Sequence, residues 1–140
     1  MAASTYLLFN GNCAEAMKFY QQVLGGKLDL MTYGDTPEGG EMPPHVDAGK
    51  IMHAHLALPD GSAIMASDDM SGAEYRGMSG FAIALNPKTA DEAKRIFDAL
   101  SEGGQIWMPL QATFWSSAFA MFADRFGTPW FVSADPAPAS

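Results

Sequence analysis

The sequence predicts an α+β fold in which a βαβββ module is written twice, and matched helix signals are the main reason. Two amphipathic segments start at comparable caps, Asn12 with Glu15 and Thr89 with Glu92, and 77 residues separate the first cap from the second. In both halves a short apolar strand precedes the helix, a Gly-Gly pair ends it, and a hairpin signal follows. One capping signal could arise by chance, but this matched order of elements indicates an internal repeat.

The first module is expected to span about residues 4–68. Its helix repeats apolar residues at i, i+3, i+4 and i+7, and the turn Pro59-Asp60-Gly61 joins its last two strands. The expected elements are a strand at 6–10, a helix at 13–24, and strands at 27–33, 52–58 and 63–66. Between the second and third strands, residues 34–50 hold three prolines and four glycines without periodicity, which is typical of a lid or a disordered insertion.

A polar, glycine-rich connector at residues 69–79 leads to the second module, expected at about 80–134. Its elements are a strand at 81–85, a helix at 90–100, and a terminal hairpin with strands at 117–123 and 128–132. Asp124-Arg125 is assigned to the turn of this hairpin, as an ion pair rather than a catalytic pair, and Gly127 is free to take a positive φ. A displacement of 66 residues relates this hairpin turn to the first, and extra residues of the long loop account for the difference from 77.

Length and composition bound the possible functions. The chain of 140 residues is expected to form one domain over residues 1–134, with 135–140 as a disordered tail. A formal charge of −8 without any basic cluster argues against nucleic acid and anionic membranes as partners. No apolar run approaches the ~20 residues that span a bilayer, and no signal peptide is evident. The single cysteine, Cys13, fits a cytoplasmic protein, and with no histidine nearby in sequence it is interpreted as structural.

Four stretches give the repeat a family resemblance. They are YLLFNGNCAEAMKFYQQVLGG at 6–26, HAHLAL with IMASDD at 53–58 and 64–69, QATFW at 111–115, and DRFGTPW at 124–130. Together they resemble the PhnB-like branch of the vicinal oxygen chelate superfamily, which includes glyoxalases, bleomycin resistance proteins and dioxygenases. The resemblance implies that the two modules form a half-open, curved mixed β-barrel with helices outside. It also implies a homodimer and a cavity for a small substrate or ligand, often with a divalent metal.

The metal ligands of that superfamily have no counterpart in this sequence. Members that use a metal take His, Gln or Glu from the first and last strands of each module, which correspond here to about Thr5, Met65, Ala82 and Phe131. A thioether suits only soft ions, and the other three side chains are poor ligands for a divalent cation. We therefore expect no metal at the usual positions and predict no cofactor.

A relocated metal site is the alternative. His53 and His55 are two residues apart on an expected strand, so they share a face, and Asp68 follows the partner strand. A two-residue hairpin loop would place His55 opposite Ala66, whereas a three-residue loop would place it opposite Met65. Such a site would make the protein a divalent-metal-dependent lyase, isomerase or dioxygenase-like enzyme.

The favoured hypothesis is a protein that binds a small apolar or aromatic molecule in the barrel pocket. The candidate pocket residues are His53, His55, Met65, Gln111, Thr113 and Trp115, with Tyr33 and His45 as candidates to close over a ligand. For Gln111 and Trp115 the competing interpretation is a packed strand with satisfied polar groups.

Two further function classes remain, methyl transfer and a structural role. Similar sequences are sometimes labelled methyltransferases, but this sequence has no glycine-rich loop between a strand and a helix that could bind S-adenosylmethionine. A purely structural dimer with a vestigial pocket stays open until ligand binding is measured. No activated nucleophile is evident either, because Ser116-Ser117 lacks the G-x-S-x-G pattern.

Overall fold

The computed structural model describes residues 1–35 and 48–136. The chain divides into two compact units, Met1–Gly77 and Met78–Ser140, and each is described by itself. Most of the long loop 34–50, including His45, and the last residues of the expected tail lie outside the described residues. The predicted half-open barrel depends on how the two units are placed relative to one another, so it stays a prediction.

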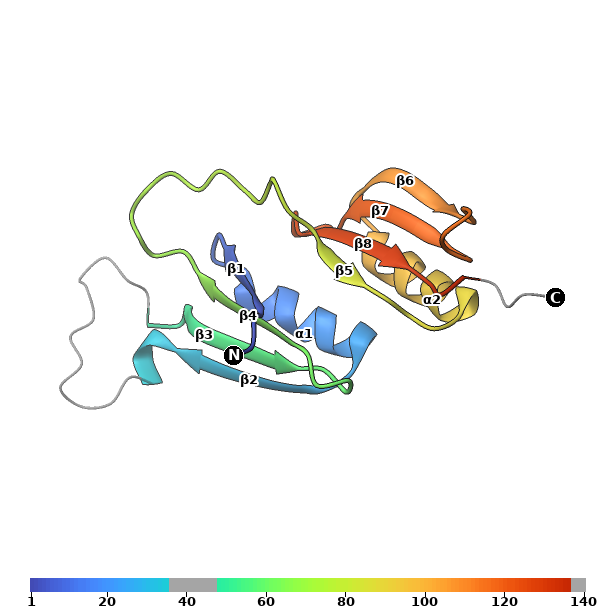
Figure 1. Ribbon diagram of the computed structural model, residues 1–140. Helices are drawn as coiled ribbons and strands as arrows, with labels where there is room; N and C mark the ends of the chain where they lie inside the picture. The colour runs from blue at the N-terminus through green and yellow to red at the C-terminus, as the bar shows by residue number, and fades with distance from the viewer. Residues whose placement is uncertain (36–47, 137–140) are drawn as a thin grey trace. The chain divides into compact units, whose positions relative to one another are not determined.

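The first unit is a four-stranded mixed sheet with one helix (Figure 1). Its elements are β1 (Thr5–Phe9), α1 (Cys13–Leu24), β2 (Lys27–Thr32), a 3-10 turn (Tyr33–Asp35), β3 (Ile51–Ala57) and β4 (Ala63–Asp68). The strand order is β1-β4-β3-β2, in which β1 runs parallel to β4 and the other pairs are antiparallel.

The second unit has the same topology. Its elements are β5 (Ile83–Leu85), α2 (Ala90–Ser101), β6 (Gln105–Gln111), β7 (Phe119–Ala123) and β8 (Pro129–Ser133). The order β5-β8-β7-β6, with β5 parallel to β8, repeats the arrangement of the first unit. The predicted α+β fold of two βαβββ modules is therefore confirmed.

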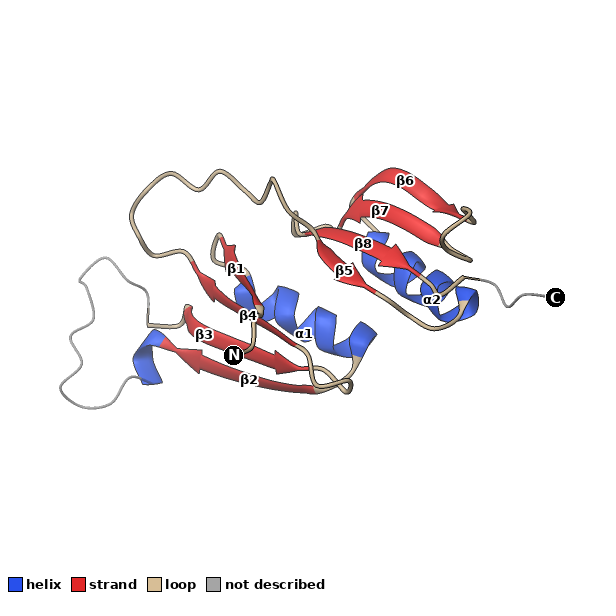
Figure 2. Ribbon diagram, viewed as in Figure 1, coloured by secondary structure: helices blue, strands red, loops and turns tan. Residues whose placement is uncertain are grey.

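Each sheet is covered by one helix on one face (Figure 2). In both hairpins every second residue is fully or almost fully buried, as expected for strands that cover a core on one side only. The buried residues are Ala54, Leu56, Ile64 and Ala66 in the first unit, and Ala120, Phe122, Trp130 and Val132 in the second. The alternate side chains of the same strands lie on the opposite, open face.

The hairpin repeat follows the expected displacement of 66 residues. Ala54 pairs with Ala66 in the first unit, and Ala120 pairs with Val132 in the second. The register also places His55 opposite Met65, which is the outcome expected for a three-residue hairpin loop.

The two helices begin differently, although their sequences look alike. Thr89 caps α2 as predicted, because its Oγ1 accepts a hydrogen bond from the Glu92 backbone N–H at 3.2 Å. The predicted cap at Asn12 is wrong, since its side chain makes no capping hydrogen bond. Asp68 takes that role from β4: its Oδ1 accepts from the Cys13 N–H at 2.9 Å.

Asp124 organises the turn between β7 and β8. Its buried carboxylate accepts hydrogen bonds from the backbone N–H groups of Phe126 and Thr128 and, at 2.8 Å, from Trp130 Nε1. These contacts fit the structural role that the sequence indicated for this turn.

Ala134 and Asp135, which follow β8, are hydrogen-bonded to the segment that precedes β7. The Ala134 N–H donates to Ala118 O at 2.9 Å, and the Asp135 O accepts from the Ser117 hydroxyl at 2.6 Å. Residues 137–140 of the expected tail lie outside the described residues, so the disordered tail stays a prediction.

Gly26 and Gly61 offer a matched test of backbone packing, because both have a φ of +93°. A Cβ on Gly26 would overlap the carbonyl oxygen of Ala57, whereas no described heavy atom lies within 4 Å of a Cβ on Gly61. We expect Gly61→Ala to cost about 1–2 kcal/mol of unfolding free energy through strain alone. Gly26→Ala should cost at least about 2 kcal/mol more through the added overlap, as measured by urea unfolding. Equal losses in the two variants would contradict this packing.

Candidate functional site

The open face of the first sheet gathers polar and sulfur-containing side chains. His53 and His55 project from β3, and the strand register aligns Met65 of β4 between His55 and Tyr6 of β1. On the other edge, β2 places Asp29 opposite His55. Strand alternation therefore brings together three of the candidate residues, His53, His55 and Met65.

Tyr6 contacts His53 across this face. The Tyr6 hydroxyl lies 3.4 Å from His53 Nδ1, and the two ring centroids are 5.9 Å apart. Tyr6 and His53 stand on strands separated by β4, so their contact spans the strand that carries Met65. This contact engages Nδ1 and leaves Nε2 available for a ligand.

Asp68 is not part of this group. Its carboxylate accepts from Cys13 N–H at the start of α1 and, at 2.9 Å, from Ile51 N–H, and the residue is only 2% exposed. The Asp68 side chain lies on the helix-covered face of the sheet, whereas the side chains of His53 and His55 lie on the open face. Across the described ranges, no three His, Cys, Asp or Glu side chains lie close enough to hold a metal ion. The alternative ligand set of His53, His55 and Asp68 is therefore not assembled.

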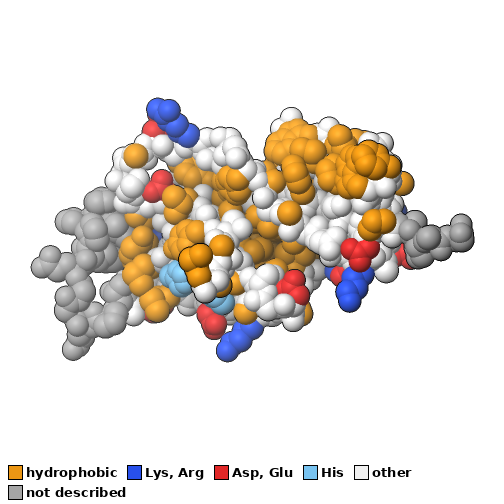
Figure 3. All heavy atoms as spheres, in the orientation of Figure 1, with side chains coloured by type: hydrophobic (Ala, Val, Ile, Leu, Met, Phe, Trp, Pro, Cys, Tyr) orange, Lys and Arg blue, Asp and Glu red, His pale blue; other side chains and the backbone are white. Residues whose placement is uncertain are grey.

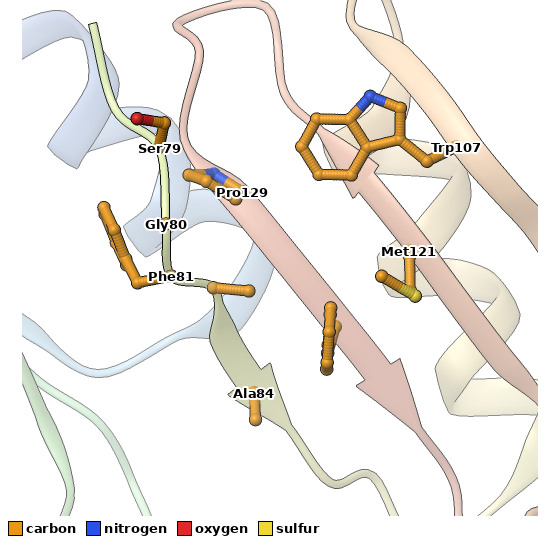
Figure 4. A pocket seen from close by; sticks show the side chains of 9 residues that line it. Ser79, Gly80, Phe81, Ala84, Trp107, Met121 and Pro129 are labelled. Atoms are coloured by element: carbon orange, nitrogen blue, oxygen red, sulfur yellow. The ribbon is translucent and has the colours of Figure 1, made fainter.

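The open face of the second sheet carries an apolar pocket of about 580 Å³ (Figure 4). Its walls come from the approach to β5 and from β6, β7 and β8, with Phe81 and Trp107 on opposite sides, Pro129 between them, and Met121 on the side of Trp107. The lining residues are Ser79, Gly80, Phe81, Ala82, Ala84, Trp107, Met121, Pro129 and Phe131. None of these described lining residues has a charged side chain.

Aromatic rings continue from the pocket toward the surface. Phe131 contacts Phe119 with ring centroids 6.0 Å apart, and Phe119 contacts Trp115 at 5.5 Å. Trp115 in turn contacts Phe114 at 4.7 Å, and the Phe114 side chain is 94% exposed. Figure 3 shows hydrophobic side chains gathered on this part of the surface.

The sequence candidates in this unit lie beside the pocket rather than in it. Thr113 shapes its own loop, because its Oγ1 accepts from the Ser116 N–H at 3.1 Å. Gln111 is exposed at the end of β6, opposite Phe119. Trp115 is linked to the pocket through Phe119, but it does not line the cavity.

Most of the pocket residues were missed from the sequence. The period-2 alternation of Phe119 and Met121 places both on one face of β7, and the same signal was available for Phe131 on β8. Trp107 had no such signal, since register shifts on both sides of Met108 interrupt the alternation of β6.

The expected metal positions divide between the two faces. Thr5 aligns with the buried Ile64, so Tyr6 rather than Thr5 accompanies Met65 on the open face. In the second unit Ala82 and Phe131 both line the pocket. None of these four positions offers the His, Gln or Glu that the superfamily pattern requires.

Burial raises the pKa of two side chains near the first sheet, Cys13 and Tyr33. Burial, and secondly the charge of Asp68, raises the pKa of the Cys13 thiol from 9.0 to about 12. Burial, followed by the neighbouring Tyr6, Asp68 and Asp69, raises the pKa of Tyr33 above its usual value. The Cys13 thiol therefore stays protonated at neutral pH, which opposes any effect of the helix N-terminus.

Comparison with known proteins gives consistent matches over nearly the whole chain. Residues 3–132 match the Glyoxalase/Bleomycin resistance protein/Dioxygenase superfamily. Protein YjdN of Escherichia coli is 36% identical over 141 residues, which cover 95% of each chain. Protein PA1353 of Pseudomonas aeruginosa is 45% identical, with a TM-score of 0.85 over 96% of this chain and 98% of that one.

A third match is informative about the fold alone. A Bacillus cereus structure titled a putative 3-demethylubiquinone-9 3-methyltransferase, PhnB protein, has a TM-score of 0.76 at 23% identity, covering 96% of this chain and 99% of that one. This likeness supports the fold of two βαβββ modules. None of the described helices is long and apolar enough to cross a membrane.

Asp68→Ala should destabilise the protein, because two buried N–H groups lose their acceptor. We expect a loss of about 2–4 kcal/mol in unfolding free energy, measured by urea denaturation. Asp69→Ala is the matched control, since the carboxylate of Asp69 accepts from Ser71 N–H in an exposed turn and should matter far less. Similar losses in both variants would contradict the structural role of Asp68.

The Cys13 thiol should be inert in the folded protein. At pH 8 we expect no reaction with the thiol reagent DTNB under native conditions, and one equivalent after unfolding in guanidinium, because the thiol is buried and protonated. Ser62→Cys, at an exposed turn position, provides the reactive control. Comparable native reaction rates for Cys13 and the control cysteine would refute the assignment.

Proposed function

Since this chain belongs to the Glyoxalase/Bleomycin resistance protein/Dioxygenase superfamily, we propose that it binds a small, neutral aromatic molecule in the pocket of its second unit. The observation that carries the proposal is the pocket itself, in which Trp107, Phe131 and Met121 form an apolar wall on an open sheet face. Its volume of about 580 Å³ falls within the range of about 300–1,000 Å³ that is usual for small-molecule sites.

The side chains of the pocket favour an aromatic ligand. Ring faces and edges attract other rings in stacked or T-shaped arrangements, which contribute about 0.5–1.5 kcal/mol beyond the burial of apolar area. The chain of contacts from Phe131 through Phe119 to Trp115 already uses this geometry, with interplanar angles of 63° and 74°. A flat ligand placed against Trp107 and Phe131 would extend the same kind of contact.

The charge of the pocket favours a neutral ligand. Among the described lining residues there is no lysine or arginine, so a carboxylate or phosphate placed there would lose hydration without gaining a counter-ion. The polar groups of the lining side chains are the Ser79 hydroxyl and the Trp107 indole N–H, and both can donate a hydrogen bond. A phenol, or a ring bearing a carbonyl group, would use those donors while its ring contacts the apolar wall.

Indole N–H signals in a ¹H–¹⁵N spectrum can test this proposal directly. The chain has three tryptophans, and only Trp107 lines the pocket, whereas Trp130 is fully buried with its Nε1 bonded to Asp124. Titration with neutral one- and two-ring aromatics such as 2-naphthol should shift the Trp107 signal and leave the Trp130 signal in place.

Substitution should then weaken the same binding. We expect Phe131→Ala to raise the dissociation constant about tenfold, because a large apolar contact of about 1.4 kcal/mol is lost. Phe97→Leu is a control on the helix-covered side, where Phe97 contacts Phe122 at 5.4 Å, and it should bind as the wild type does. Failure of every such compound to move the Trp107 signal would refute the proposal and favour a structural protein with a vestigial pocket.

A further inference from the structure

The open face of the first sheet combines two imidazoles with a thioether. His53 and His55 lie two residues apart on β3, about 6.6 Å along the strand. Met65 stands directly opposite His55 on β4, where Cβ atoms are about 4.5–5.5 Å apart. All three residues are only partly buried, and Figure 3 shows histidine side chains at the surface beside hydrophobic ones.

This donor set differs from those that hold divalent cations. Zn²⁺ sites usually draw three or four ligands from His, Cys, Asp and Glu, and no such group of three occurs where the structure is described. Thioethers instead favour soft ions, above all Cu(I), and imidazole is also a good copper ligand. Two imidazoles and one thioether therefore match a soft metal ion.

Tyr6 contacts one ring nitrogen of His53 and leaves the other for a ligand. Its hydroxyl lies 3.4 Å from His53 Nδ1, so that nitrogen has a partner and Nε2 is the nitrogen left for a metal. Ligating histidines usually hold their second ring nitrogen in such a contact, which fixes the orientation of the ring. The contact spans β4, the strand of Met65, whereas Met31 lies opposite His53 on β2.

We propose that His53, His55 and Met65 form a binding site for one Cu(I) ion on the open face of the first sheet. The site uses His53 Nε2, one nitrogen of His55 and the Met65 sulfur, with Tyr6 as a positioning residue. Its residues all belong to the first unit, whereas the residues of the aromatic pocket all belong to the second.

Anaerobic titration with Cu(I), in ascorbate and against the chromogenic chelator bicinchoninate, tests the assignment. We expect one equivalent of Cu(I) per wild-type chain. His53→Gln, His55→Gln and Met65→Leu should each weaken the affinity at least tenfold, whereas Met31→Leu should keep it within about twofold as a thioether control on the same face. Tyr6→Phe should cause a smaller loss, because it removes a contact to a ligand rather than a ligand itself.

Copper K-edge absorption supplies a readout that does not depend on affinity. The spectrum should contain one sulfur scatterer with nitrogen scatterers, and the sulfur should disappear in Met65→Leu but not in Met31→Leu. Far-UV circular dichroism of each variant shows whether the sheet is intact. Phe131→Ala, in the aromatic pocket, should bind copper as the wild type does.

Three results would overturn the proposal. One is wild-type protein that retains no Cu(I) against the chelator, and a second is a His53→Gln/His55→Gln double variant that binds as well as the wild type. The third is an equal effect of Met31→Leu and Met65→Leu, which would remove the specific role of Met65. Because the aromatic pocket is tested with metal-free protein, failure of one proposal is separable from failure of the other.

Discussion

Each four-stranded sheet has one helix to cover it, and this single cover is the constraint on which the rest of the structure depends. Side chains alternate between the two faces of a strand. Every second residue must therefore be apolar to pack under the helix, whereas the residues between them need not be apolar. The helix-covered positions follow the rule closely, with Leu56 and Ile64 in the first unit and Phe122 and Trp130 at the corresponding places in the second. Residues on the open face of each sheet are therefore available for ligand binding.

The two open faces have used that freedom in different ways. Tyr6, His55 and Met65 carry oxygen, nitrogen and sulfur donors, whereas Trp107, Met121 and Phe131 form a wall that is mostly carbon. His55 and Met121 occupy equivalent register positions, as do Met65 and Phe131, so the backbone cannot be the source of the difference. A duplicated fold thus supports two chemically distinct surfaces, because the residues that hold the fold together and the residues that face outward lie on opposite sides of the same strands.

The sequence predicted the parts of the fold that depend on local signals, namely both helices, both hairpins and the repeat. It could not predict contacts between residues that are far apart in the sequence. The cap of α1 comes from Asp68, which is 55 residues from Cys13, and no residue near Asn12 indicates this contact. The candidate site followed the same division. His53, His55 and Met65 were placed together by regular alternation, whereas Trp107 was hidden by the irregular pairing of β6, and Thr113 proved to serve its own loop. Local periodicity is informative only while the ladder stays regular.

Asp68 shows why residue type alone is a weak guide to function in this fold. A carboxylate close in sequence to two histidines suggests a metal ligand, yet one step along a strand reverses the face, and Asp68 is only 2% exposed. There its two oxygens join three elements, because they accept from the first residue of α1 and the first residue of β3 while the residue itself ends β4. A carboxylate committed to two buried backbone groups cannot turn toward the open face without leaving both unpaired. The same interaction that secures the helix therefore keeps the Asp68 carboxylate away from the open face that carries His53, His55 and Met65.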